Sequence, residues 1–353
     1  MSARAPLIVG VLADHPAAGG ASFARVVRLA FADVRTSGRL DRELCLVEEQ
    51  ADGLPRGSAA AVEAAFGRLR DQGAVAIIGP AISDNGLVVR ELADATGLPC
   101  INWTGGEQTR SAWMFQYQVG SLEEEPGLLA LHLATQGVRR VAVLVDDSIV
   151  GLRCHEFFTP AAQRAGLTLD VQITFSTEDP VDYGAIVQSV RSYHPEAIVY
   201  LGLWSAAHGI ADALAELAWR PRMLANSALM YGHASPEWAR AWHGWRYVDA
   251  YSDGNTVLRG ILARLGEQPG VAAVTAAAAY DMGRLVAEGI ASAPAATRAG
   301  VKDGLERVKL MPAALGADGT TMGFGNWERA ALKGRYLVLR EWLAGRSVEV
   351  ETP

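Results

Sequence analysis

The sequence predicts an α/β protein of two doubly wound lobes, each a parallel sheet covered by helices on both faces. Three observations support this fold class. Short apolar runs alternate with stretches of helical periodicity along most of the chain. A second cycle of similar design begins near residue 120. The length of 353 residues also exceeds what one hydrophobic core ordinarily supports.

The first cycle occupies about 120 residues. Its second helix is capped by Ser58 and closed by Gly73, which are typical residues for the two ends of a helix. Strands and helices alternate strictly, and this order predicts right-handed crossovers between parallel strands. The expected strands are 7–12, 44–48, 75–78 and 100–102, and the expected helices are 22–34, 58–72 and 83–96.

The second cycle repeats the alternation, and a tail follows it. The tail is not expected to form a third domain, because its helices need the face of an existing sheet to cover. A chain that returns to both lobes crosses between them several times, which forms a multi-strand hinge. The expected strands are 141–145, 167–175, 197–202, 223–226, 322–324 and 336–340, and the expected helices are 122–136, 151–165, 183–193, 206–219, 257–265, 271–291 and 297–308.

Composition excludes several classes of partner. The net charge is −7 and the isoelectric point is about 5.6, whereas a nucleic-acid-binding surface needs a basic face. No apolar run has the length of a membrane span, so we expect no direct membrane insertion. The first strand follows the amino terminus directly, without an apolar leader. The localisation is therefore cytoplasmic if the chain is complete, and periplasmic or extracellular if a leader was removed.

Catalytic and metal-binding motifs are missing. The sequence lacks a Gly-x-Ser-x-Gly elbow, a phosphate-binding Gly-x-x-x-x-Gly-Lys-Ser/Thr loop and a His-Glu-x-x-His pair. Asp146 and Asp147 have no obvious third oxygen ligand nearby, which favours a solvated strand end. Cys45, Cys100 and Cys154 lie in apolar contexts and are expected to be buried free thiols. We therefore expect no enzyme, no cofactor and no metal.

Polar loops end two neighbouring strands of the first predicted sheet. The run 76–78 stops at Gly79-Pro80-Ala81-Ile82-Ser83, and the run 100–102 stops at Trp103-Thr104-Gly105. Ligands of open α/β sheets bind at the carboxyl ends of the strands. The two loops therefore predict a polar rim that holds a small molecule.

Landmarks along nearly the whole chain resemble the Leu/Ile/Val-binding proteins, which have the type 1 periplasmic-binding-protein fold. The resemblance implies one lobe of residues 1–120 and 251–328 and a second of 121–250 and 329–353, with the ligand held in the cleft between them. The matching pieces are Ile77-Ile78-Gly79-Pro80 with Ser83, Gly97-Leu98-Pro99, Arg140–Asp146 with Gly151, Ile198–Gly202, Tyr280-Asp281 and Tyr336–Arg340.

The resemblance implies where the ligand binds. Ser83, Thr104 and Gly105 fall where the family holds the carboxylate of its ligand, through hydroxyl and backbone N–H donors. Val150 stands where the family has an aromatic residue. Ser227 lies near the position at which amino acid-binding members of the family carry an acidic residue, which holds the ammonium group of the ligand. Residues 224–228 of this chain contain no carboxylate. The family's disulfide in the first lobe is also absent.

Four further residues complete the candidate site. Trp103 and Trp204 lie on strand-end loops, one in each lobe, and suit an aromatic or amide-bearing ligand, with packing of the lobe as the alternative. Asp281 would meet a cationic group, or brace the hinge. Asn102 is a further polar candidate with a turn or capping role as its alternative.

Two function classes stay open at this point. The first is the substrate-binding component of an ABC transporter that delivers an aromatic acid, an amide or an amino acid derivative to a permease. The second is a cytoplasmic sensor of the same fold that acts on a regulator protein. An α/β enzyme is a remote third.

Overall fold

The computed structural model describes residues 4–15, 19–54, 56–176, 180–266 and 271–350. Contacts divide the chain into two compact units. Unit 1 comprises residues 1–119 and 250–336, and unit 2 comprises residues 120–249 and 337–353. The chain therefore passes from one unit to the other three times, after Val119, after Asp249 and after Tyr336.

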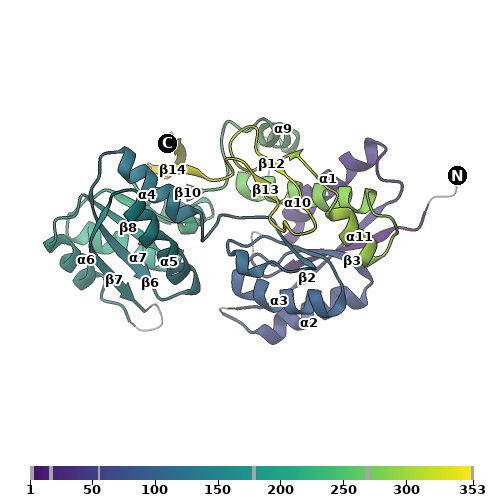
Figure 1. Ribbon diagram of the computed structural model, residues 1–353, viewed down its shortest axis with the longest axis horizontal. Coiled ribbons are helices and arrows are strands. Elements are labelled where there is room, and N and C mark those ends of the chain that lie inside the picture. The colour runs from purple at the N-terminus through teal and green to yellow at the C-terminus, as the bar shows by residue number, and fades with distance from the viewer. Residues whose placement is uncertain (1–3, 16–18, 55, 177–179, 267–270, 351–353) are drawn as a thin grey trace. The chain divides into compact units, whose positions relative to one another are not determined.

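Unit 1 is built on a five-stranded parallel sheet in the order β2-β1-β3-β4-β5. Helices α2 and α3 cover one face, while α1, α10 and α11 lie on the other (Figure 1). The elements are β1 (Leu7–Ala13), α1 (Gly20–Thr36), β2 (Leu44–Gln50), α2 (Ala59–Asp71), β3 (Ala74–Ile78), α3 (Ser83–Thr96), β4 (Cys100–Asn102), η2 (Glu107–Thr109), β5 (Met114–Gln116), α9 (Thr256–Leu265), α10 (Ala273–Ala291), α11 (Arg298–Leu305), β11 (Met311–Pro312), β12 (Thr321–Met322) and β13 (Leu332–Lys333).

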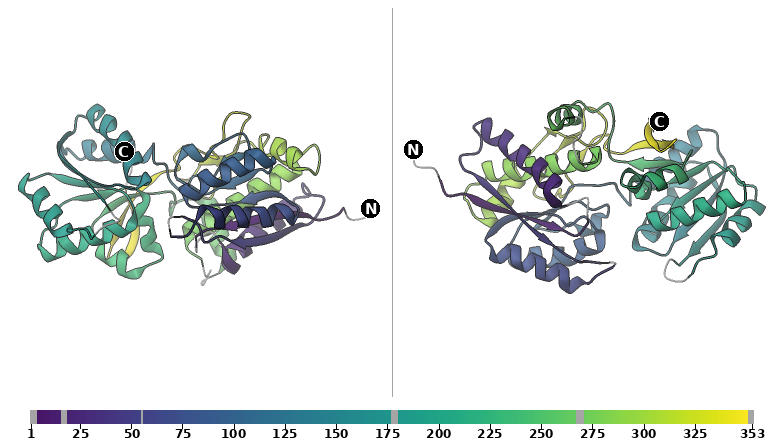
Figure 2. Two further views of the ribbon diagram at one scale, coloured as in Figure 1. Left: turned by 90° about the horizontal axis from the view of Figure 1, so that it is seen from below. Right: turned by 180° about the vertical axis from the view of Figure 1, so that it is seen from behind.

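Unit 2 is built on a seven-stranded sheet in the order β15-β14-β10-β9-β8-β6-β7. Its strands are parallel except that β14 runs antiparallel to β10, and β15 runs antiparallel to β14. The yellow carboxyl-terminal segment lies beside the teal strands of this sheet (Figure 2). The elements are α4 (Glu125–Thr135), β6 (Arg140–Asp146), α5 (Ile149–Arg164), β7 (Thr168–Phe175), α6 (Tyr183–Ser192), β8 (Ala197–Leu201), α7 (Trp204–Glu216), β9 (Met223–Ala225), η3 (Ser227–His233), α8 (Pro236–Ala241), β10 (Arg246–Asp249), β14 (Val338–Leu343) and β15 (Arg346–Val350).

Strand β6 shows why the sheet of unit 2 needs helices on both faces. Val141, Val143 and Val145 belong to the core that α4 and α5 close. Ala142 and Leu144 face the opposite core, with residues of α6 and α7. Successive side chains of a strand point to opposite faces, so a strand that is apolar throughout must be buried on both sides. The predicted α/β class of two doubly wound parallel sheets is confirmed.

The structure differs from the sequence expectations in the tail. The strand expected at 336–340 is β14, which begins at Val338, and β15 extends the sheet beyond it. Strand β13 pairs with β12 of unit 1, so the last crossing comes after Tyr336 and not after residue 328. Among the cysteines, Cys100 and Cys154 are buried free thiols, but Cys45 is only half-buried because β2 is an edge strand.

Candidate functional site

The loop after β3 brings Ser83 to the amino terminus of α3. Ser83 is the first residue of this helix and is half-buried. No described residue forms a hydrogen bond with its hydroxyl group. The first N–H groups of a helix carry partial positive charge and have no partner within the helix. This position therefore offers one neutral side-chain donor and acceptor.

Asp14 directly follows β1 and contacts the loop after β3. Its Oδ1 accepts the Ala81 N–H at 2.8 Å, and its Oδ2 accepts the Ile82 N–H at 3.0 Å and the Asn85 amide at 2.8 Å. Burial raises the pKa of Asp14, against the lowering effect of these hydrogen bonds. Sequence reasoning missed Asp14, because its partners lie 67 to 71 positions further along the chain.

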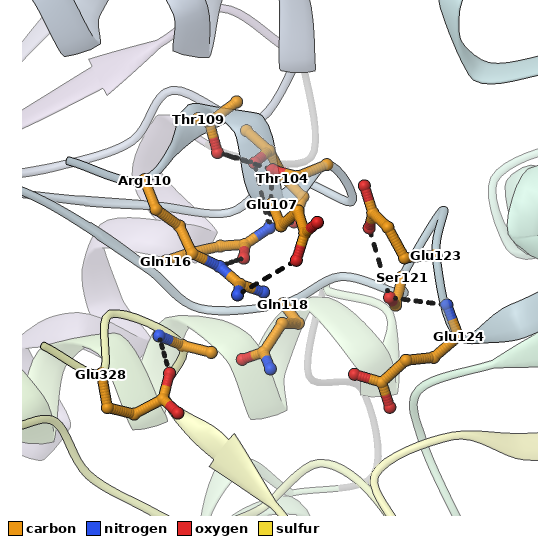
Figure 3. Close-up of polar contacts among 12 residues, drawn as sticks. Thr104, Glu107, Thr109, Arg110, Gln116, Gln118, Ser121, Glu123, Glu124 and Glu328 are labelled. Carbon is orange, nitrogen blue, oxygen red and sulfur yellow. Dashed lines mark hydrogen bonds and ion pairs between the residues drawn. The ribbon is translucent and has the colours of Figure 1, made fainter. Parts of the chain in front are cut away.

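The loop after β4 is closed by its own hydrogen bonds. Thr104 is fully buried, and its N–H and hydroxyl both lie within bonding distance of Asn102 Oδ1, at 3.2 and 2.8 Å. The Asn102 amide donates to the Thr109 hydroxyl at 3.2 Å. Gln116 Nε2 donates to the Thr104 carbonyl at 2.7 Å, and Figure 3 shows Gln116 beside Thr104 and Thr109. Asn102 is thus engaged by residues of its own loop. The geometry does not favour Thr104 as a donor to a ligand, since Asn102 already engages both of its donor groups.

The two neighbours of Thr104 differ from each other in exposure. Gly105 is half-buried at a bend. Trp103 is only 4% exposed, and its backbone N–H donates to the Pro80 carbonyl at 2.8 Å, which ties the two strand-end loops together. Its indole N–H is buried, and none of the described residues accepts from it.

Asp281 lies inside unit 1, in the middle of α10. Its Oδ2 accepts the Tyr117 hydroxyl at 2.7 Å and the Ala314 N–H at 2.6 Å. The side chain is fully buried, and desolvation raises the pKa of Asp281 to about 6. These contacts give Asp281 a bracing role and do not favour contact with a cationic ligand group.

In unit 2 a buried carboxylate organises the ends of β6 and β8. Asp146 Oδ2 accepts the Leu203 N–H at 2.6 Å and lies 2.9 Å from the Tyr200 hydroxyl, while Oδ1 accepts the Ser148 hydroxyl at 2.5 Å. Asp146 is fully buried, so the expectation of a solvated strand end was wrong for it, although Asp147 is exposed. The network fixes the residues immediately before Trp204.

Trp204 begins α7 and belongs to an aromatic cluster. Its ring stacks on Trp238 with centroids 4.3 Å apart, and Tyr231 lies at 6.0 Å. All three rings are half-buried. Val150, at the start of α5, is half-buried and packs against the core of α4 and α5.

Ser227 contacts a carboxylate that lies outside residues 224–228. Glu125, the first residue of α4, accepts the Ser227 N–H at 2.7 Å through Oε2 and the Ser121 N–H at 2.7 Å through Oε1. Glu125 is fully buried, and desolvation raises its pKa to about 7. The sequence shows no carboxylate at 224–228, but the fold supplies one from a residue 102 positions away.

In the described part of the chain, no group of three or more histidine, cysteine or carboxylate side chains is arranged to hold a metal ion. Within the same ranges, no helix is both long enough and apolar enough to cross a membrane.

The three chain crossings, the two doubly covered parallel sheets and the polar strand-end loops define the class of type 1 periplasmic binding folds. The chain belongs to the periplasmic binding protein family, whose model matches residues 9–331. The resemblance seen in the sequence is thereby confirmed for family and fold.

Solved structures agree on the fold. A substrate-binding protein of an ABC transporter from Desulfitobacterium hafniense has a TM-score of 0.81 at 17% identity, over 98% of this chain and 100% of that one. The leucine-binding protein LivK of Thermotoga maritima has a TM-score of 0.78 at 18% identity, over 98% of each chain. LivJ of Streptococcus pneumoniae, solved with isoleucine, has a TM-score of 0.81 at 15% identity, over 98% of this chain and 100% of that one. No curated protein sequence matches the chain.

Proposed function

We propose that the chain is a ligand-binding receptor for a small solute that bears a carboxylate or an amide group. The observation that carries the proposal is the family match, which extends over residues 9–331 and so over both units. Solved relatives of the same fold are named as leucine-binding and branched-chain amino acid transport proteins. We infer the corresponding role here, delivery of the solute to the permease of an ABC transporter.

Each unit carries candidate ligand-binding residues of a different chemical kind. In unit 1, Ser83 and Gly105 offer polar groups for the head group of a ligand, because both are half-buried and the Ser83 hydroxyl has no hydrogen-bond partner among the described residues. In unit 2, Trp204 and its aromatic neighbours supply an apolar contact surface. Ser227 lies on the loop that Glu125 holds in place, and its side chain as well as its N–H interacts with Glu125.

Binding to the purified chain tests the proposal. We expect a saturable rise in melting temperature with at least one member of a panel of leucine, isoleucine, valine, phenylalanine, their primary amides, phenylacetate and phenylacetamide. A ligand at a hundred times its Kd adds about 2.7 kcal/mol of stability. The absence of any rise across the panel would contradict the proposed ligand class.

Ser83→Ala tests the assignment of the site. Loss of one hydrogen bond to the ligand should weaken binding by roughly five- to tenfold, measured by titration calorimetry, with an unchanged melting temperature of the free protein. Ser189→Ala, an exposed position on α6, is the matched control and should bind as the unmodified chain does. Equal affinities of all three proteins would remove Ser83 from the site.

A further inference from the structure

The loops of unit 1 hold fewer anion-binding donors than their sequence suggests. The Ala81 and Ile82 N–H groups, which precede α3, both donate to Asp14. Both donors of Thr104 are engaged by Asn102. A ligand carboxylate needs several N–H or O–H donors to replace its hydration. Four such donors in these loops already form hydrogen bonds with oxygens of Asp14 or Asn102.

The charge around Ser83 also opposes an anion. Asp14 contacts the backbone of Ile82, the residue before Ser83, and Asp84 is the residue after it. A carboxylate at the amino terminus of a helix offsets the positive end of the helix dipole, so α3 has little attraction left for a second anion. Two groups near Asp14 complete the charge balance. Burial lowers the pKa of His15, which keeps its imidazole neutral at pH 7. The positive charge of Arg56 also lowers the pKa of His15, and Arg56 is exposed.

The same atoms suit a group that both donates and accepts. Asp14 Oδ1 accepts the Ala81 N–H, and a carboxylate group has about four acceptor positions in all. The Ser83 hydroxyl can donate to a carbonyl oxygen. A primary carboxamide offers this combination, an N–H for Asp14 and a C=O for Ser83. A ligand carboxylate in the same place would bring one of its acceptor oxygens against the acceptor oxygen of Asp14.

We propose that Asp14 is a specificity-determining residue, which selects a carboxamide over a carboxylate as the head group bound beside Ser83. This inference rests on the proposed receptor function and narrows its ligand class. Asp14 acts through direct contact with the ligand and through its hold on the Ala81 and Ile82 N–H groups. An acid and its amide of equal size thus become distinguishable ligands.

Matched pairs of ligands test the inference in the unmodified chain. Phenylacetamide is compared with phenylacetate, and leucinamide with leucine, by titration calorimetry at pH 7. We expect the amide of a pair to bind at least about tenfold more tightly than the acid. Equal or tighter binding of the acid would overturn the inference and leave the receptor function standing. Binding of neither acid nor amide would contradict both.

Asp14→Asn tests the role of the charge. The substitution removes the negative charge at nearly constant shape, so the preference for the amide should fall at least about fivefold. Asp71→Asn, at an exposed position at the end of α2, is the charge-matched control and should keep the full preference. A preserved preference in folded Asp14→Asn would overturn the assignment to Asp14. If that variant does not fold, the acid–amide comparison in the unmodified chain still decides the inference.

Discussion

Asp146→Ala should lower the free energy of unfolding by roughly 3 kcal/mol, because it removes a fully buried carboxylate that several donors share as their acceptor. The Leu203 N–H and the Ser148 hydroxyl both donate to this carboxylate, and the Tyr200 hydroxyl lies beside it. A buried donor without an acceptor costs about 1–3 kcal/mol. Urea unfolding followed by circular dichroism measures the loss.

Neighbouring positions provide the controls for Asp146. Asp147→Ala changes an exposed carboxylate at the adjacent position and should cost less than about 0.5 kcal/mol. Gly202→Ala reaches the same network from β8, since a Cβ there would lie 2.3 Å from the Asp146 carboxyl group, and it should be strongly destabilising. Gly127→Ala, on α4, meets no atom within 4 Å and should be neutral or slightly stabilising. A loss below 1 kcal/mol in Asp146→Ala would contradict the role of the network.

The parts of the fold that follow from local sequence could be predicted. Strands such as β6 and β8 are continuous apolar runs, which only a sheet buried on both faces accommodates. The last strand, β15, could not be placed, since it alternates half-buried and exposed side chains at the edge of the sheet. The short elements η3 and α8 after β9 are held by packing in the core of α6 and α7, which local periodicity does not reveal.

The candidate site was predictable only in its outline. The rule that ligands bind at strand ends pointed to the loops of Ser83 and Trp204, which begin α3 and α7. It could not show which donors the chain itself uses. Asp14, Glu125 and Asp146 engage backbone N–H groups 67, 102 and 57 positions away, and only the folded chain brings them together.

Glu125 should make the stability of the protein fall as the pH rises from about 4.5 to about 7. Desolvation raises the pKa of this carboxyl from 4.5 to about 7 in the folded chain. Between these values the native state holds a proton that the unfolded state has released, so raising the pH favours unfolding. The full window corresponds to about 3 kcal/mol, at 1.36 kcal/mol for each pH unit.

Glu125→Gln should remove most of this slope, because glutamine keeps the shape and one oxygen acceptor but does not titrate. The free energy of unfolding is measured by urea denaturation of both proteins at pH 5, 6, 7 and 8. Asp281, with a pKa raised to about 6, contributes a slope of the same sign below pH 6 in both proteins. The comparison between pH 6 and pH 8 therefore isolates Glu125. Parallel curves for the two proteins in that interval would show that Glu125 does not carry the titration, and that the tie from α4 to Ser227 is held by a carboxylate that stays ionised.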